Sequence, residues 1–211
     1  VRLTTEAQHF CKNRLPFLGL NPVFGAPLPY QSWLGRTNNT MWNAIAGGTL
    51  EGAVHPAPIH ELKRDPEQDE LHEFGRWTRA AIPIGAGHKA FHITSFYGPQ
   101  KGDLIRNNYA ERLFKILFEF SRDFGSQMPA AICCDINRNP AECATLRLAM
   151  ARTGWTDVGQ HIVGETQPPD TYYHCGAAHA GMNGQGCSRI DLILVNQVAL
   201  AALQSYEQIY G

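Results

Sequence analysis

Apolar residues recur along the chain at two different periods, which predict helices and strands in alternation. Segments with helical spacing or clear capping residues predict helices. They are residues 4–15, 108–120 and 140–154. Short apolar runs bounded by Gly, Pro or polar residues predict strands. They are residues 49–54, 77–84, 90–97, 130–134 and 188–195. This order of elements indicates an α/β protein with more strand than helix.

The segments between these elements are polar or rich in Pro, Gly and Asn. Residues 16–46 have that composition and predict loop with short extended pieces. A mixed cluster of charges predicts an exposed excursion over residues 56–73, and residues 155–186 predict loop with a short strand around Tyr172. There is neither an internal repeat nor a linker, and the length suits one domain. We therefore interpret residues 1–211 as a single domain.

Composition and charge narrow the functional classes. Lys and Arg number 18, Asp and Glu number 19, and the formal net charge is -1. Such a chain has no basic footprint for holding nucleic acid or an anionic membrane by bulk charge. No apolar run approaches the roughly 18 residues of a membrane span, and no secretory signal pattern opens the chain. A nucleic-acid enzyme with this charge must rely on local contacts and a bound cation.

Cysteine usage points to a reducing, intracellular compartment. The six cysteines form no Cys-x-x-Cys pair, and a chain of this length does not need disulfide bonds. Cys133 and Cys134 lie in an apolar run and are expected to be small core residues. His174, Cys175, His179 and Cys187 are zinc-type ligands, but their spacing matches no closed zinc motif. We interpret them as part of a Gly-rich loop.

The first stretch with chemical potential is an apolar strand that runs into Asp135, Ile136 and Asn137. Because side chains alternate along a strand, Asp135 and Asn137 are expected to project to one side of its end. A carboxylate there can accept a proton from water, and an amide can orient that water. The alternative is an Asx turn in which both side chains only satisfy backbone groups. The stretch alone does not decide between the two.

Two further stretches carry polar groups at or near strand ends. Asp191 lies in the apolar run from Ser188 to Val195, where an unpaired carboxylate is costly to bury. It therefore needs a partner, and the structural alternative is a salt bridge to Arg189 on the same face. Tyr97 ends the run before Gly98, with a core aromatic as the alternative interpretation.

Together the three stretches resemble the endonuclease/exonuclease/phosphatase family. The matching segments are GGTLEGAV, FHITSFYGP, CCDINRNP and SRIDLILVN, in the order that the family shows. The resemblance covers essentially the whole chain, and SRID and the Asp-x-Asn strand end are its specific parts. It implies an α/β fold of the DNase I type, a two-sheet sandwich with outer helices, and a divalent-cation-dependent phosphodiesterase or phosphatase.

The resemblance also implies roles for individual residues. Asp135 is expected to orient or deprotonate the attacking water, and Asn137 to hold the phosphate or that water. Tyr97 is expected to donate to the phosphate as negative charge builds up in the transition state. Asp191 is expected to orient the catalytic His. Thr171 is the expected phosphate contact in the following loop.

Several features depart from the family pattern. The family's Gly before the catalytic Asp is Cys134 here, which we expect to place a side chain near the site. The metal-binding Glu of the family is expected just before Val1, since Glu6 falls inside the first helix. The closing Asp-His is expected beyond Gly211. We therefore expect a domain incomplete at both termini, without its first and last strands and with no metal ligand of its own. Mg²⁺ or Mn²⁺ is expected in the complete domain, and whether these residues alone form an enzyme stays open.

Three functions compete. The order FYGP, Asp-x-Asn, Gly-Trp-x-Asp at residues 154–157 and SRID most resembles the endonuclease of non-long-terminal-repeat retrotransposons. That function implies nucleic acid, with DNA as the expected partner, no membrane, and a nuclear location if the chain derives from a retrotransposon. The second is a phosphatase for an inositol phosphate or lipid headgroup, although those enzymes usually carry Trp-Cys-Asp-Arg in the later strand. The third is a non-catalytic binding module.

Overall fold

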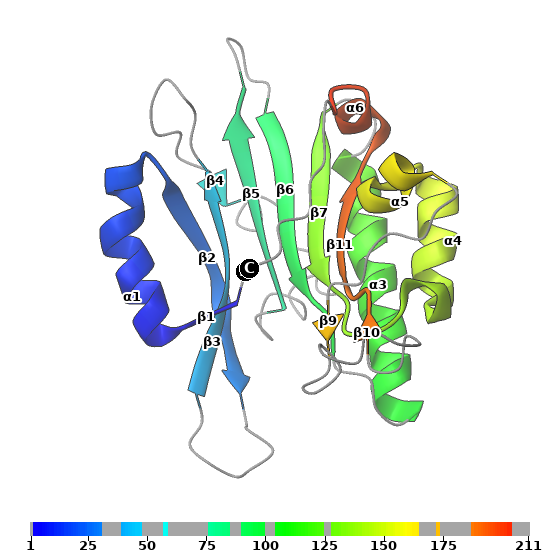
Figure 1. The fold of residues 1–211 in the computed structure, drawn as a ribbon, viewed down its shortest axis with the longest axis horizontal. Coiled ribbons are helices and arrows are strands. Elements are labelled where there is room, and N and C mark those ends of the chain that lie inside the picture. The colour runs from blue at the N-terminus through cyan, green and yellow to red at the C-terminus, as the bar shows by residue number, and fades with distance from the viewer. Residues whose placement is uncertain are drawn as a thin grey trace. The chain divides into compact units, whose positions relative to one another are not determined.

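The computed structural model describes the chain in nine segments. They are residues 2–30, 39–47, 57–58, 76–84, 90–99, 104–124, 128–164, 172–173 and 187–203. The chain forms two compact units, Val1–Tyr97 and Gly98–Gly211, and each is described by itself (Figure 1). The single domain expected for residues 1–211 stays a prediction.

The described residues of the first unit form two antiparallel arrangements of strands, the α-helix α1 and a short 3-10 helix. Its elements are β1 Arg2–Thr4, α1 Thr5–Arg14, the 3-10 helix η1 Leu15–Leu18, β2 Asn21–Tyr30, β3 Asn39–Gly47, β4 Ala57–Pro58, β5 Trp77–Pro83 and β6 Ala90–Tyr97. Strand β3 pairs with β1 and β2, while β5 pairs with β4 and β6. Val23 and Ile45 of the first arrangement and Ala80 of the second form a buried cluster, against which Ile93 packs.

Strand β2 corrects the loop expected over residues 16–46. It contains Pro22, Pro27 and Pro29, and the pairing shifts between Phe24 and Pro27. In the described sheet β2 lies at an edge, next to β3 only. An edge strand tolerates proline because one side of its backbone has no ladder to complete. The high proline content therefore led to the prediction of a loop where the structure has a strand.

The other expectations for this unit divide into three groups. The helix expected at residues 4–15 is confirmed as α1, and the strands expected at 77–84 and 90–97 are confirmed as β5 and β6. The short strand β1 was not predicted. The strand expected at residues 49–54 lies outside the described residues.

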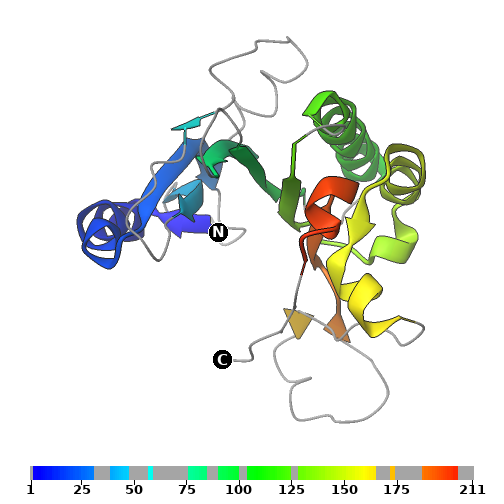
Figure 2. The same cartoon turned by 90° about the horizontal axis from the view of Figure 1, so that it is seen from above.

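The second unit places helices against an antiparallel ladder. Its elements are α3 Leu104–Phe124, β7 Ala130–Asp135, the 3-10 helix η2 Pro140–Glu142, α4 Ala144–Thr153, β8 Thr156–Asp157, α5 Val158–Val163, β9 Tyr172–Tyr173, β10 Cys187–Ser188, β11 Asp191–Val195 and α6 Gln197–Leu200. Strand β11 pairs with β7 on one side and β8 on the other, and β9 pairs with β10. Figure 2 shows α3 and α4 side by side on one side of the β7–β11 pair.

One face of this ladder is buried and the other is accessible. Ile132, Leu192 and Leu194 are at most 3% exposed, whereas Asp191 and Ile193 on the same strands' other face are exposed. Alternation along β11 produces this division. The accessible face is therefore the one that carries Asp191.

Two expected elements are interrupted. The helix expected from Pro140 breaks at Cys143, whose backbone is extended with φ -91° and ψ 96°. Asn139 caps only the 3-10 turn η2, which precedes α4, and its Oδ1 accepts from the Ala141 N–H at 2.9 Å. The strand expected at residues 188–195 likewise breaks at Arg189 and Ile190. A capping residue followed by proline can begin either a short 3-10 turn or a longer α-helix, and an apolar run can form one strand or two. The sequence pattern alone therefore does not determine where these elements break.

The segment 155–186, expected to be mostly loop, contains β8 and α5, while the short strand near Tyr172 is present as β9. The described residues thus form a mixed α/β structure, as expected. None of the helices among them has both the length and the apolar character of a membrane span. The two-sheet sandwich stays a prediction.

Candidate active site

Two candidate carboxylates meet across one strand pair. Asp135 ends β7 and Asp191 begins β11, and the two residues are direct cross-strand partners. The Ile136 N–H donates to the Ile190 carbonyl at 2.8 Å, so that neighbouring pair is hydrogen-bonded. The Asp135–Asp191 pair is then of the non-hydrogen-bonded type, in which Cα atoms are about 4.5 Å apart and side chains lie on one face. The structure therefore brings these two predicted residues together.

Asn137 is linked to Asp135 through an Asx turn. Its backbone N–H donates to Asp135 Oδ1 at 2.9 Å, and its φ of 54° is in the left-handed region that Asn tolerates. Its Nδ2 donates to the Gly98 carbonyl at 2.8 Å. The structural alternative for this stretch is thus present. It also fixes the orientation of both side chains, which a catalytic role requires.

The segment Gly98–Pro99 is fastened to this turn. The Gly98 N–H donates to the Asp135 carbonyl at 2.7 Å, and Arg138 Nη2 donates to the Pro99 carbonyl at 3.5 Å. A Cβ at Gly98 would lie 2.9 Å from the Ile136 carbonyl oxygen. Only glycine allows the two backbones to come this close.

Arg189 does not pair with Asp191, contrary to the structural alternative for that residue. Its Nη1 and Nη2 donate to the two carboxylate oxygens of Asp157 at 2.6 and 2.5 Å. Both side chains are only 9% exposed. Asp157 Oδ1 also accepts from the Gln160 N–H at 3.4 Å and so caps α5. The signal in the sequence was an arginine beside an apolar run, which needs a carboxylate partner if it is buried. That partner, Asp157, lies 32 positions away along the chain.

The burial expected for Asp191 is wrong, because its side chain is exposed. The run Leu192–Val195 looks uniformly apolar, yet the strand alternates between a buried and an accessible face. Asp191 falls on the accessible face. Asp191 therefore pays no free-energy cost of burial among the described residues.

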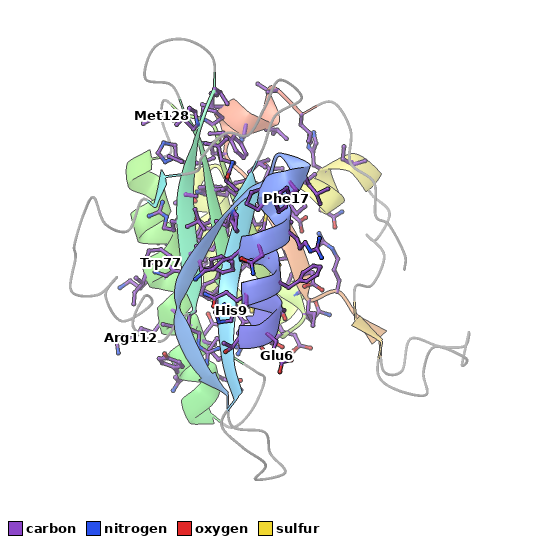
Figure 3. All side chains as sticks on the ribbon, turned by 90° about the vertical axis from the view of Figure 1, so that its left-hand side faces the viewer. Glu6, His9, Phe17, Trp77, Arg112 and Met128 are labelled. Atoms are coloured by element: carbon purple, nitrogen blue, oxygen red, sulfur yellow. The ribbon has the colours of Figure 1, made fainter. Side chains whose placement is uncertain are left out.

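Two other predicted site residues, Tyr97 and Thr171, are not among the described residues of the second unit. Tyr97 is half-buried at the end of the first unit, where the Arg76 guanidinium lies 5.6 Å from its ring centroid and Arg76 Nη1 donates to its carbonyl at 3.4 Å. Its role beside the carboxylates stays a prediction. Thr171 lies outside the described residues. Glu6 lies inside α1, where the first helix was expected, and it is exposed there together with His9 (Figure 3).

Cys134 belongs to the buried face of β7. Its thiol donates to the Leu192 carbonyl at 3.7 Å. Burial raises the pKa of this thiol well above its usual range, and the neighbouring Cys133 and the carboxylates of Asp157, Asp135 and Asp191 raise it further. Successive side chains alternate across a strand, so Cys134 points away from the carboxylate face. Its thiol is still close enough to feel the charges of Asp135 and Asp191, so the expectation of a side chain near the site stays a prediction.

The donor atoms at the site suit a hard cation held partly by water. Asp135, Asp191 and Asn137 offer oxygen, the donor that Mg²⁺ prefers, and Mg²⁺ is often bound through only one or two carboxylates. Like charges directly opposite each other destabilise a strand pair, and a cation beside them would offset that repulsion. In the described segments no three His, Cys, Asp or Glu side chains gather as a metal cluster. The residues present thus fit a water-rich Mg²⁺ site rather than a closed metal cage.

The fold is that of the endonuclease/exonuclease/phosphatase-like proteins. An AP endonuclease from Archaeoglobus fulgidus is 20% identical, with a TM-score of 0.61 over 92% of this chain and 75% of its own. The human Nocturnin catalytic domain with bound sulfate is 15% identical, with a TM-score of 0.58 over 93% and 68%. The endonuclease domain of TRAS1, a telomere-specific non-LTR retrotransposon, is 13% identical, with a TM-score of 0.52 over 90% and 72%. Neither a protein-family model nor a curated protein matches the chain.

Proposed function

We propose that the chain belongs to a divalent-cation-dependent phosphodiester hydrolase that cuts nucleic acid. The observation that carries this proposal is the cross-strand pair of Asp135 and Asp191, with Asn137 oriented beside it. Two carboxylates and an oriented amide on one accessible face can position water and a cation around a phosphate. Solved structures of the same fold include two endonucleases, which supports the choice of nucleic acid.

Each residue has a distinct proposed task. Asp135 orients the attacking water and accepts its proton. Asn137 Nδ2 donates one N–H to the Gly98 carbonyl, and its second N–H or its Oδ1 would contact the phosphate or the water. Asp191 orients a catalytic histidine through its ring N–H. Tyr97 and Thr171 contact the phosphate, with the Tyr97 hydroxyl donating where negative charge builds up.

The expected cofactor is Mg²⁺ or Mn²⁺, which when bound would neutralise charge on the phosphate. Asp135 and Asp191 are the described carboxylates that could share in holding it. We further propose DNA as the substrate and the retrotransposon endonuclease as the type, because the order of the Asp-x-Asn, Gly-Trp-x-Asp and SRID stretches matches that branch. A nuclear location accompanies this type.

The test is a nicking assay on supercoiled plasmid with the full protein that the gene encodes. We expect open circles to form in Mg²⁺ and not in EDTA. Inositol phosphates and a labelled RNA serve as parallel substrates. Release of phosphate from inositol phosphates without nicking would replace the nuclease by the phosphatase alternative, and DNA binding without turnover would replace it by the binding module.

A further inference from the structure

Arg189 stands two residues before Asp191, where a cation could be expected to contact a substrate phosphate. The structure uses it otherwise. Both terminal nitrogens of its guanidinium are engaged by Asp157 at 2.6 and 2.5 Å, and the side chain is 9% exposed. A two-point pair of this kind fixes direction as well as distance.

The pair connects the beginning of β11 to the strand on its other side. Asp157 lies opposite Leu194, near the far end of β11, so the pair connects the residue before β11 with the neighbouring strand β8. Arg189 itself stands in the break between β10 and β11. The pair therefore holds the residues at which β11 starts.

Helix α5 closes over the guanidinium. A Cβ at Gly159 would lie 2.6 Å from Arg189 Nη2, so a larger residue there would push the guanidinium from its place. Asp157 in addition caps the first turn of the same helix through the Gln160 N–H. Strand β8, helix α5 and the start of β11 thus meet at one buried ion pair.

We infer that Arg189 and Asp157 are positioning residues that hold Asp191, the first residue of β11, opposite Asp135. The Ile136 N–H bond to the Ile190 carbonyl is the ladder contact next to that carboxylate pair. Loosening the ion pair should release this end of the ladder first. The functional part of the inference rests on the proposed hydrolase activity, whereas the structural part does not.

The kinetic test compares three variants that disturb the pair in different ways. Asp157→Asn removes the charge and keeps the shape, Arg189→Lys keeps the charge and loses the fork, and Gly159→Ala pushes on the guanidinium. We expect each to lower kcat about 10- to 100-fold with KM within about twofold, the usual effect of disturbing an orienting partner. The conservative Asp157→Glu should recover part of the loss. Arg147→Lys, on the exposed face of α4, is the matched control and should behave as wild type.

The structural test is amide hydrogen exchange in the same proteins without substrate. We expect exchange at the Ile136 amide to accelerate about tenfold or more, because its acceptor is the Ile190 carbonyl. The Asn196 amide, which bonds to the Ala130 carbonyl at the other end of the ladder, is the internal control and should change little.

The outcomes separate the possibilities. A raised KM in Arg189→Lys alone, with normal Asp157→Asn and Gly159→Ala, would mean a phosphate contact and overturn the inference. Equal acceleration at Ile136 and Asn196, or unchanged kcat per folded molecule, would reduce the pair to general stability. If the wild-type protein cleaves nothing, the proposed function fails, while the exchange at Ile136 still decides whether the pair holds this end of the strand.

Discussion

Asp135 has two tasks in the structure that a single substitution can separate. Its Oδ1 accepts the Asn137 N–H, and its charge serves the proposed water activation. Asparagine keeps an acceptor at this position and removes the charge.

We therefore expect Asp135→Asn to keep its melting temperature close to that of wild type and to lose a factor of about 10² to 10⁴ in kcat. Asp135→Ala should lose both activity and part of the stability. The measurements are plasmid nicking and thermal unfolding of each variant, with Glu142→Gln as an exposed acidic control. Wild-type turnover by Asp135→Asn would leave only the turn-forming role.

At this scale the sequence showed which polar residues stand at strand ends better than it showed their contacts. Asp135, Asn137 and Asp191 were identifiable because polar residues stood at the ends of apolar runs. The partner of Arg189 was not identifiable, since nothing local connects it to Asp157, 32 positions away. The exposure of Asp191 was hidden as well, because an apolar run does not reveal which face is covered.

Among the elements, α4 begins without a side-chain cap of its own. Cys143 makes no capping hydrogen bond, and instead Glu111 of α3 accepts the Thr145 N–H at 3.0 Å. One helix therefore caps its neighbour. The acid in turn lies near the positive end of the α4 dipole.

Removing this cap should cost about 1 kcal/mol of unfolding free energy, the usual loss for a helix N-cap. We expect that loss for Glu111→Ala in urea unfolding. Glu111→Gln retains an acceptor oxygen and should lie between Glu111→Ala and wild type. Equal stability of all three proteins would contradict a capping role.

Strand β6 carries a buried histidine that makes stability depend on pH. Burial lowers the pKa of His92 from 6.5, and the positive charge of Arg79 lowers it further. The folded protein therefore keeps His92 neutral at a pH where the unfolded chain already binds a proton. Stability should fall as pH decreases below about 6.5.

We expect the unfolding free energy of wild type to decrease between about pH 7.5 and about pH 5.5 by more than that of His92→Gln. The difference between the two proteins isolates His92 from other titrating groups. Parallel curves for both would show that His92 binds protons equally in the folded and unfolded states.

The elements themselves were largely predictable. A regular apolar pattern or a short apolar run located α3, β5, β6 and β7, while α1 was located although its buried residue is Gln8 and Phe10 is exposed. Strand β2 was missed because prolines are allowed at a sheet edge, and the break at Cys143 was missed because Asn139 and Pro140 begin a 3-10 turn as readily as an α-helix. In both places the surroundings, rather than local preference, decide.

For the whole molecule, the net charge of -1 means that DNA cannot be held by bulk attraction. Two carboxylates on the accessible face add local repulsion. We expect affinity for a short duplex, measured by fluorescence anisotropy, to fall about tenfold or more when Mg²⁺ is replaced by EDTA.

The double variant Asp135→Asn, Asp191→Asn gives the matched comparison. It removes the repelling charges, so its binding should depend much less on Mg²⁺. A wild-type protein that binds equally well in both buffers would contradict a cation between the carboxylates and the phosphate. The fold type was predictable at this scale from the order of motifs, while the pairing of strands that brings Asp135 and Asp191 together required the structure.

The contact between Gly159 and the Arg189 guanidinium has an evolutionary consequence. Glycine at position 159 is useful only while a flat cation lies against it, and that cation is tolerable in the interior only while Asp157 is present. A related protein that has lost Asp157, Gly159 or Arg189 would gain little from keeping the other two residues. Related genes should therefore inherit or abandon Asp157, Gly159 and Arg189 as a set, and lineages that have abandoned it should show altered Asp191 positions as well.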